Sequence, residues 1–216
     1  MGLSRWLMKY MRKINTSKHA KKQPISLLNQ RKLILIACCG ITEGLYFQNL
    51  RRELRGISQL TVKVIPKNPA KILENVLRLA DFNYFDHVWL IVDKDDFPNI
   101  QGLISKAKRQ KINISYSNPC FELWIYLHFE YLQSPIPRAD YAKRIEKSLR
   151  KQRGLKKYCY NKSDRNLSYY ISANRKTAIS RAERLLNYWA SGSNINADTN
   201  DPSTNLFELI KSLFPH

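Results

Sequence analysis

Short apolar runs alternate with amphipathic stretches along the first two-thirds of the chain. Residues 33–38 (LILIAC) and 87–92 (HVWLIV) are apolar without alternation, which is typical of strands covered on both faces. Residues 60–66 (LTVKVIP) and 112–116 (INISY) alternate, which predicts two further strands. Helical spacing of apolar residues predicts helices over residues 43–55, 69–81 and 98–110, and over about 12 aromatic-rich residues from Pro119.

This order of strands and helices with short connections predicts an α/β fold, with a mostly parallel sheet flanked by helices. Two more helices are expected at 138–150 and 171–189, separated by a polar stretch, and a short helix at 205–214. The predicted organisation is a basic N-terminal tail at 1–32, an α/β core at 33–132, a basic helical C-terminal arm at 133–190, and a linker with the final helix at 191–216.

The distribution of charge indicates a polyanionic partner. The chain has 37 Lys and Arg against 17 Asp and Glu, a formal net charge of +20. Residues 1–32 hold nine bases and no acid, and residues 138–184 hold fifteen bases and four acids, so these two segments account for the whole excess. Nucleic acid is favoured over a membrane surface as the partner. The basic tail is interpreted either as an amphipathic helix that touches RNA or a membrane surface, or as a poorly ordered segment.

We expect a soluble, cytoplasmic protein with no membrane span. The longest apolar run, Leu33–Ile41, has nine residues, whereas a membrane-spanning helix needs about 20. The N-terminus has no continuous signal-peptide core. The four cysteines lack zinc-site spacing, and Cys38 and Cys39 are interpreted as small hydrophobic residues in a reducing compartment.

An acidic cluster, Asp93-Lys94-Asp95-Asp96, follows the strand predicted at 87–92. Ligands of open α/β sheets bind at the carboxyl ends of the strands. On an extended backbone Asp93 and Asp95 would point to the same side, where they could hold Mg²⁺. The alternative is a solvated acidic turn that caps the next helix.

Two glutamates could join this cluster. Glu43 follows the first strand, and Glu122 opens the apolar segment after Pro119. A charge in so apolar a stretch is costly unless it is paired or bound to a metal. The alternative for Glu122 is a helix N-terminal carboxylate that the helix dipole stabilises. His128, in the same apolar stretch, is interpreted as a buried core histidine and not as a ligand.

Tyrosines and bases are interleaved in the arm. Aromatic rings stack on bases while cations hold phosphates, so this composition suits single-stranded nucleic acid or RNA loops. The alternative is a solvated basic surface with half-buried tyrosines. The residues expected to contact nucleic acid are Lys156, Lys157, Tyr158, Tyr160, Lys162, Arg165, Arg175 and Lys176.

Four motifs in the same order resemble the RloB-like family, a Toprim-related group associated with bacterial restriction and phage-defence loci. The family patterns CEGxxTExxYF, DxD, SNPxFExWxLLHF and NPSTxVxxLVxxL correspond here to residues 38–47 (CCGITEGLYF), 93–95 (DKD), 117–129 (SNPCFELWIYLHF) and 201–213 (DPSTNLFELIKSL). The segment SNPCFELW is the most specific of them.

The resemblance implies a Toprim-like fold and a Mg²⁺ site, with Mn²⁺ as a substitute, for phosphodiester chemistry. Asp93, Asp95 and Glu122 would hold the metal and Glu43 would assist. The implied activity is a nuclease that acts in antiphage defence on RNA, with tRNA as one candidate, or on DNA. A partner defence ATPase or restriction complex is also implied.

One position departs from the family at the expected site. Cys39 stands where the family has the first Glu of its CEG motif, and only the second acid, Glu43, is kept. A thiolate is a poor ligand for Mg²⁺, and a neutral thiol cannot act as a general base. Two interpretations therefore stay open: a nuclease that relies on Glu43, or a nucleic-acid-binding member that cleaves poorly or not at all.

Overall fold

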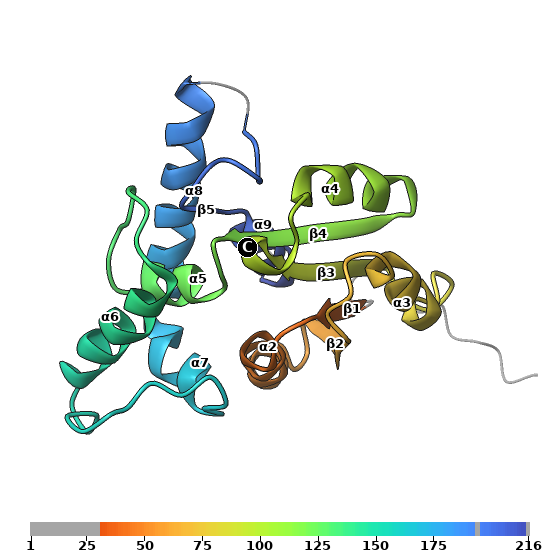
Figure 1. The fold of residues 1–216 in the computed structure, drawn as a ribbon. Coiled ribbons are helices and arrows are strands. Elements are labelled where there is room, and N and C mark those ends of the chain that lie inside the picture. Colours follow the sequence, from red (N-terminus) through yellow and green to blue (C-terminus); the bar gives the residue numbers. More distant parts are fainter. Residues whose placement is uncertain (1–30, 193–194, 215–216) are drawn as a thin grey trace, which may run out of the picture. The chain divides into compact units, whose positions relative to one another are not determined.

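The computed structural model describes residues 31–192 and 195–214. Its centre is a five-stranded sheet in the order β2-β1-β3-β4-β5 (Figure 1). The strands are β1 (Lys32–Cys38), β2 (Ser58–Val64), β3 (His87–Asp93), β4 (Ile112–Asn118) and β5 (Ser203–Thr204). The first four are parallel, and only the two-residue β5 runs antiparallel, beside β4.

The apolar runs of the sequence form strands because both faces of the sheet are covered. Along β1, Ile34, Ile36 and Cys38 point into one hydrophobic cluster. Leu35 and Ala37 point into another on the opposite face. A strand buried on both faces must be apolar at every position, which explains why 33–38 shows no alternation.

Helices cover the two faces unequally. One face carries α3 (Ile72–Leu79) and α4 (Ile100–Arg109), whose buried side chains share a cluster. The other face carries α2 (Ile41–Glu53), α5 (Glu122–Leu127), α6 (Arg138–Arg150), α7 (Leu167–Ile171), α8 (Arg175–Gly192) and α9 (Leu206–Leu213). This mostly parallel sheet flanked by helices confirms the predicted α/β class and is consistent with a Toprim-like fold.

The basic arm shares the core of the sheet. Tyr141, Ile145 and Leu149 of α6 and Ala178 of α8 lie in the same cluster as Ile34 of β1. Every residue of α5 is buried, and its Trp124 is fully buried. Residues 31–216 accordingly form one compact unit. Figure 1 shows α6, α7 and α8 close together, and α5 contacts both α6 and α8.

Three local features differ from the sequence-based expectation. The helix expected to run about 12 residues from Pro119 is only the six-residue α5, because its hydrogen bonds tighten to i+3 at His128 and Phe129 and the helix ends there. A separate five-residue helix, α7, with Leu167 and Ile171 buried, precedes the helix expected at 171–189, which begins only at Arg175 as α8. Two short 3₁₀ helices, η2 (Lys94–Asp96) and η3 (Ser172–Asn174), complete the fold.

The segment expected to be a linker stabilises the sheet. The two carboxylate oxygens of Asp198 accept hydrogen bonds from the backbone N–H groups of Ile100 (2.7 Å) and Gln101 (3.0 Å). These groups begin α4 and have no partner within the helix. Ser203 and Thr204 then pair with β4 as β5. This part of the chain is therefore a structural element.

Two further expectations concern the ends of the chain and the membrane. The basic tail expected at 1–32 lies outside the described residues except for Arg31 and Lys32, and Lys32 begins β1. Within the parts of the chain that the structure describes, no helix is both long and apolar enough to cross a membrane.

His128 is a buried core residue, as its apolar surroundings predicted. Its side chain is 2% exposed. Its ring Nδ1 lies 2.9 Å from the carbonyl oxygen of Trp124, so Nδ1 carries the proton and donates it. The ring meets that of Trp124 edge to face, with centroids 5.0 Å apart. Burial lowers the pKa of His128 to about 3.

We predict that His128 makes the folded state less stable as the pH falls below about 6.5. An unfolded histidine binds a proton near that pH, whereas the buried ring does not until about pH 3. The contribution lost at pH 5, relative to neutral pH, is about 2 kcal/mol. Urea unfolding at pH 5, 6 and 7 should show a shallower pH dependence for His128→Gln than for the unchanged protein. Equal slopes would contradict the assignment.

Candidate functional site

Acidic side chains converge at the carboxyl ends of three strands. Asp93 is the last residue of β3, Glu43 lies in the first turn of the helix after β1, and Glu122 begins the helix after β4. After β1 the chain forms β2 on one side of that strand and then crosses over to form β3 on the other side. The boundary between β1 and β3 is therefore a topological switch point. Ligands of open α/β sheets bind at this place.

These residues line one cavity of about 280 Å³. It contains three carboxylates, from Glu43, Asp93 and Glu122, and three basic side chains from separate parts of the chain. The basic residues are Lys67, which follows β2, Arg138 at the start of α6, and Lys162 from the arm; Cys39, Gly40, Ile41, Thr42, Phe121 and Ser163 complete the lining. We call this the acidic cavity.

Glu43 owes its position to the glycine that precedes α2. It is the third residue of α2 and is 5% exposed. Its carboxylate folds back over Gly40, where a Cβ atom would clash with both carboxylate oxygens. Negative charge is favoured there by the unpaired N–H groups of the first helical turn. A residue larger than glycine at position 40 would therefore displace the Glu43 carboxylate.

Asp93 is buried with one carboxylate oxygen unpaired within the part of the chain that the structure describes. It is 4% exposed, and its Oδ1 has no hydrogen-bond partner among the described residues. Its Oδ2 lies 4.0 Å from the Arg138 guanidinium. Burial, followed by the negative charges of Glu43 and Glu122, raises the pKa of Asp93 well above its ordinary value. Burial also raises the pKa of Glu43, with a further contribution from Glu122.

The pKa of Glu122 is shifted in the opposite direction. Burial alone would raise its pKa, but the Lys162 ammonium 3.1 Å away and several hydrogen bonds outweigh that effect and lower it. The Tyr160 hydroxyl donates a hydrogen bond to the same oxygen at 3.2 Å. Glu122 is therefore held as a carboxylate by two residues of the arm.

Asp95 is not placed as expected. It lies in the 3₁₀ helix η2 instead of on an extended backbone, and it does not line the acidic cavity. It still shares a partner with Asp93, because Arg138 lies 2.9 Å from Asp95 and 4.0 Å from Asp93. Asp96 pairs with Lys67 at 2.6 Å. The cluster does not cap the next helix, because Asn99 and the distant Asp198 do so.

The donor atoms suit a hard cation, but their arrangement does not yet form a metal site. Buried carboxylate oxygens, one of them without a partner, are the ligands that Mg²⁺ prefers. Within residues 31–192 and 195–214, however, no group of three or more His, Cys, Asp or Glu side chains is close enough to hold a metal. Cys39 adds no ligand for Mg²⁺, because burial and the charge of Glu43 raise its thiol pKa to about 12.

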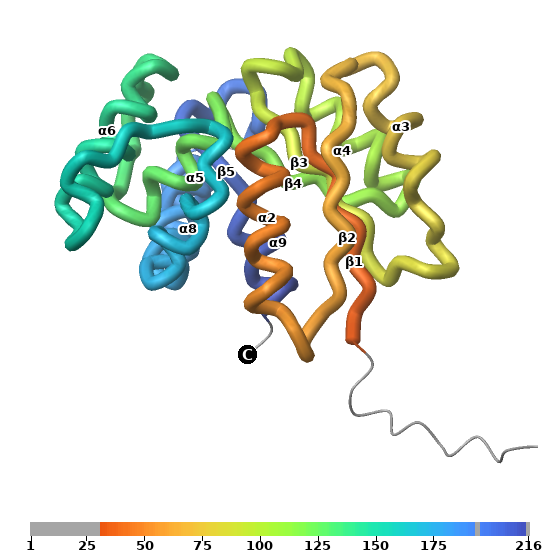
Figure 2. The backbone as a smooth tube through the Cα atoms, turned by 90° about the horizontal axis from the view of Figure 1, so that it is seen from below, coloured from red at the N-terminus to blue at the C-terminus, as the bar shows by residue number. Residues whose placement is uncertain are grey.

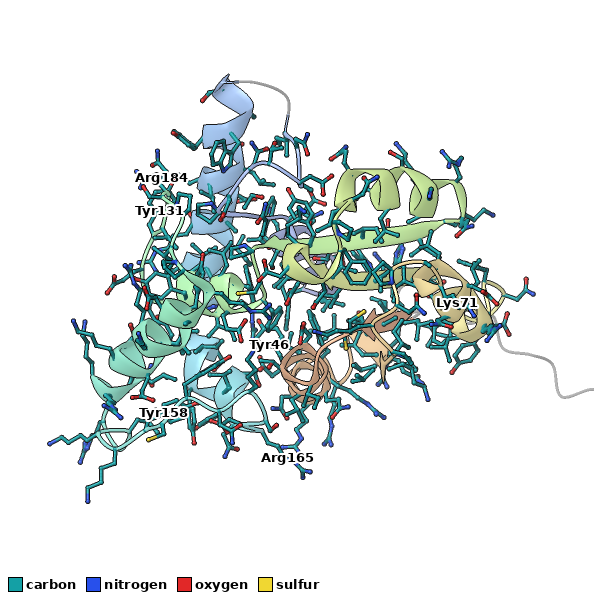
Figure 3. The ribbon with its side chains drawn as sticks, viewed as in Figure 1. Tyr46, Lys71, Tyr131, Tyr158, Arg165 and Arg184 are labelled. Atoms are coloured by element: carbon teal, nitrogen blue, oxygen red, sulfur yellow. The ribbon has the colours of Figure 1, made fainter. Side chains whose placement is uncertain are left out.

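The arm reaches the acidic cavity through its loop of residues 151–166. The Thr42 hydroxyl donates to the backbone oxygen of Lys162 at 3.0 Å, and the Asn49 amide donates to that of Arg165. These bonds hold the loop against α2. Figure 3 shows Tyr158 and Arg165 on this loop, away from the sheet.

The other residues expected to bind nucleic acid have mixed surroundings. Lys156 and Lys157 are exposed. The Tyr158 hydroxyl bonds to Asp164 at 2.7 Å, and its ring packs edge-on against Tyr170. Arg175 pairs with Glu53 of α2 at 2.6 Å and lies over the ring of Phe214 beyond α9, so its guanidinium is engaged within the protein.

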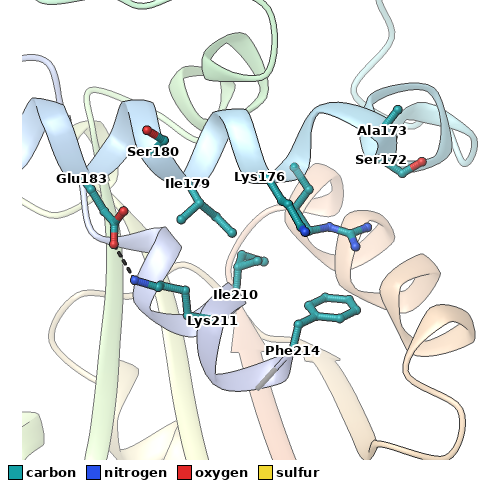
Figure 4. A pocket seen from close by; sticks show the side chains of 10 residues that line it. Ser172, Ala173, Lys176, Ile179, Ser180, Glu183, Ile210, Lys211 and Phe214 are labelled. Carbon is teal, nitrogen blue, oxygen red and sulfur yellow. Dashed lines mark hydrogen bonds and ion pairs between the residues drawn. The ribbon is translucent and has the colours of Figure 1, made fainter. Parts of the chain in front are cut away.

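Lys176 lines a different hollow, between α8 and α9, with a volume of about 570 Å³ (Figure 4). Its walls are mainly apolar and include Ile179, Ile210 and Phe214. The one carboxylate in it, Glu183, is paired with Lys211 at 2.6 Å (Figure 4). This hollow therefore lacks the convergent carboxylates of the acidic cavity.

The sequence reasoning missed Lys67 and Arg138. Both lie in loops or at a helix start, without a motif around them. A weak indication existed for Lys67, because it follows a predicted strand whose carboxyl end reaches the same edge of the sheet as Asp93. Nothing comparable pointed to Arg138.

The fold and site together define an α/β, Toprim-like protein with buried carboxylates at the carboxyl edge of its sheet. Residues 34–213 match the family model described as RloB-like protein. The chain therefore belongs to the RloB-like family, which confirms the resemblance found in its motifs. Comparisons with curated proteins and with solved structures gave no match.

We predict that Lys162→Gln raises the pKa of Glu122, because the ammonium at 3.1 Å favours the ionised carboxylate. The pKa can be measured from the ¹³C chemical shift of the Glu122 carboxyl group across a pH titration. Lys156→Gln is the matched control, because it removes an exposed charge from the same loop. An unchanged Glu122 pKa in Lys162→Gln would contradict the pairing.

Proposed function

We propose that this protein is a Mg²⁺-dependent nuclease of Toprim type that cleaves RNA or DNA in defence against phage. The observation that carries the proposal is the convergence of Glu43, Asp93 and Glu122, from three strand ends, on one cavity that also contains basic side chains. Carboxylates suit a hard cation, and basic side chains suit the phosphate that the cation would act on. Family membership supports the same chemistry.

In this proposal Asp93 and Glu122 hold the cation from the walls of the acidic cavity, and Asp95 joins them from η2 when Arg138 releases it. Mn²⁺ can replace Mg²⁺, and Glu43 assists. When bound, the cation supplies an activated water and stabilises charge on the phosphate. Arg138 and Lys162 now pair with Asp95 and Glu122. The phosphate of a substrate gives these two basic side chains a new partner, which frees the carboxylates of Asp95 and Glu122. Lys67, which also lines the cavity, binds the same phosphate.

The arm supplies the remaining contacts with the substrate. Exposed Lys156 and Lys157 bind the backbone of the nucleic acid, and Lys162 lies where that backbone would enter the cavity. Tyr160 positions Glu122 through the hydrogen bond from its hydroxyl. RNA, including tRNA, and DNA both carry the phosphates that this surface would recognise. A defence ATPase or restriction complex is the proposed protein partner.

We predict that Asp93→Asn and Glu122→Gln each lower cleavage by a factor on the order of 100 or more, because each removes a ligand charge. Cleavage of labelled tRNA and single-stranded DNA is measured with Mg²⁺, with Mn²⁺ and with EDTA. Asp140→Asn is the matched control, because Asp140 lies in the first turn of α6 and its one ion-pair partner among the described residues is Lys143. Equal cleavage by all forms, or none by the unchanged protein, would overturn the proposal.

A second candidate function is nucleic-acid binding without efficient cleavage. Cys39 favours it, because this residue lines the acidic cavity where the family has a carboxylate. It is 9% exposed, and its pKa of about 12 keeps the thiol neutral. The arm and its basic charge could persist in such a member.

Cys39→Glu separates the two candidates. If the chain is an impaired enzyme, this change should switch on Mg²⁺-dependent cleavage, because it restores the missing carboxylate. Cys39→Ser is the control for the loss of the thiol alone, and thermal unfolding checks that each variant folds. Efficient cleavage by the unchanged protein would exclude the binding-only function.

A further inference from the structure

Four arginines gather at the edge of the sheet opposite the acidic cavity. Arg51 and Arg52 are in the last turn of α2, Arg55 follows that helix, and Arg31 precedes β1. Figure 2 shows why they meet: α2 begins beside the carboxyl end of β1 and ends near the start of that strand. Together with Gln48, Ser58 and Gln59 they line a hollow of about 680 Å³. We call it the arginine hollow.

The positive charge of the arginine hollow is not compensated within the described part of the chain. All four arginines are exposed, none has an acidic side chain within 4.0 Å among the described residues, and no acidic residue lines the hollow. The nearest acid in the sequence, Glu53, forms an ion pair with Arg175 at 2.6 Å. This local excess therefore remains available for an anionic ligand.

Helix stability explains only part of this cluster. Basic residues in the last turn of a helix interact favourably with its dipole, which accounts for Arg51 and Arg52. That effect does not reach Arg31, which comes from a different part of the chain, and it falls off beyond the last turn, where Arg55 lies. The convergence of arginines from two segments on one hollow indicates a binding surface.

The side chains fit phosphodiesters. A guanidinium group binds phosphate oxygens through two parallel hydrogen bonds and stays charged at any physiological pH. Gln and Ser side chains add neutral donors, as they do in contacts with the sugar-phosphate backbone. We propose that the arginine hollow binds the backbone of the nucleic acid whose cleavage was proposed above, at a point remote from the acidic cavity; the inference rests on that function for the identity of its ligand.

The distance between the two sites sets the length of nucleic acid that can reach both. Helix α2 carries Glu43 in its first turn and Arg52 nine residues further on, an axial distance of about 13.5 Å. A duplex advances about 3.4 Å per base step, so about four steps span this distance. Shorter nucleic acids can occupy only one of the two sites.

The test is nucleic-acid binding in EDTA, measured by fluorescence anisotropy with a 20-base-pair duplex. The variant Arg51→Gln/Arg52→Gln/Arg55→Gln should lose affinity at least about tenfold at 0.1 M salt. The slope of log K against log salt should become less negative by up to about 2.7, for three contacts at about 0.9 each. Its matched control is Lys106→Gln/Lys108→Gln/Arg109→Gln, which removes three charges from the last turn of α4. Equal losses in both variants would overturn the proposal, because they would reflect net charge alone.

Further measurements test whether the effect is specific to this hollow. Replacing the same three arginines by lysine keeps the charge, so it should restore the salt slope and most of the affinity. A four-base-pair duplex cannot reach both sites at once. It can still bind at the acidic cavity alone, so it should lose less affinity in the glutamine variant than the 20-base-pair duplex does. Inorganic tripolyphosphate serves as the free anion: if the glutamine variant loses tripolyphosphate binding but keeps duplex binding, the hollow is a polyphosphate site and the proposal is wrong. Without divalent metal the assay is independent of cleavage, so an inactive protein could still confirm this surface.

Discussion

The burial of three carboxylates at one edge of the sheet is the constraint on which the rest of the structure depends. Asp93, Glu43 and Glu122 repel one another and are removed from water, so ionising all of them is costly unless cations approach. The cations come from far along the chain, as Arg138 from α6 and Lys162 from the arm. The arm is therefore part of the electrostatic balance of the core and belongs to the same folding unit.

These ion pairs suit a site that binds phosphate better than a site whose charges stay permanently paired with one another. An ion pair between a buried acid and a half-exposed base can exchange partners when another anion or cation arrives. Lys162 has a side chain that is 58% exposed while its partner Glu122 is 6% exposed. The exposed member of the pair is thus the base, which faces solvent. Arg138, which lies between Asp93 and Asp95, has the same character.

Much of this arrangement was predictable, and the failures have physical causes. The strands β1 and β3 could be found because burial on both faces demands unbroken apolar runs. The approach of Glu43, Asp93 and Glu122 followed from their positions after parallel strands. The position of Asp95 could not be predicted, because it lies in a 3₁₀ turn immediately after β3. So short a turn leaves no periodic pattern in the sequence. Arg31 and Arg51 could not be associated either, since only the antiparallel return of α2 beside β1 brings them together.

The attachment of the C-terminal segment to β4 has a consequence for how the protein is made. Thr204 bonds to Ser117 at 3.1 Å, Asn205 accepts from the backbone of Tyr116 at 2.8 Å, and Asp198 caps α4. Four buried residues of α9 fill the core beneath the sheet. These residues follow β1 to β4 in the chain, so the edge of the sheet that bears the acids lacks this support until the segment that provides it has been synthesised. A truncated product would carry the acidic residues without the framework that sets their geometry.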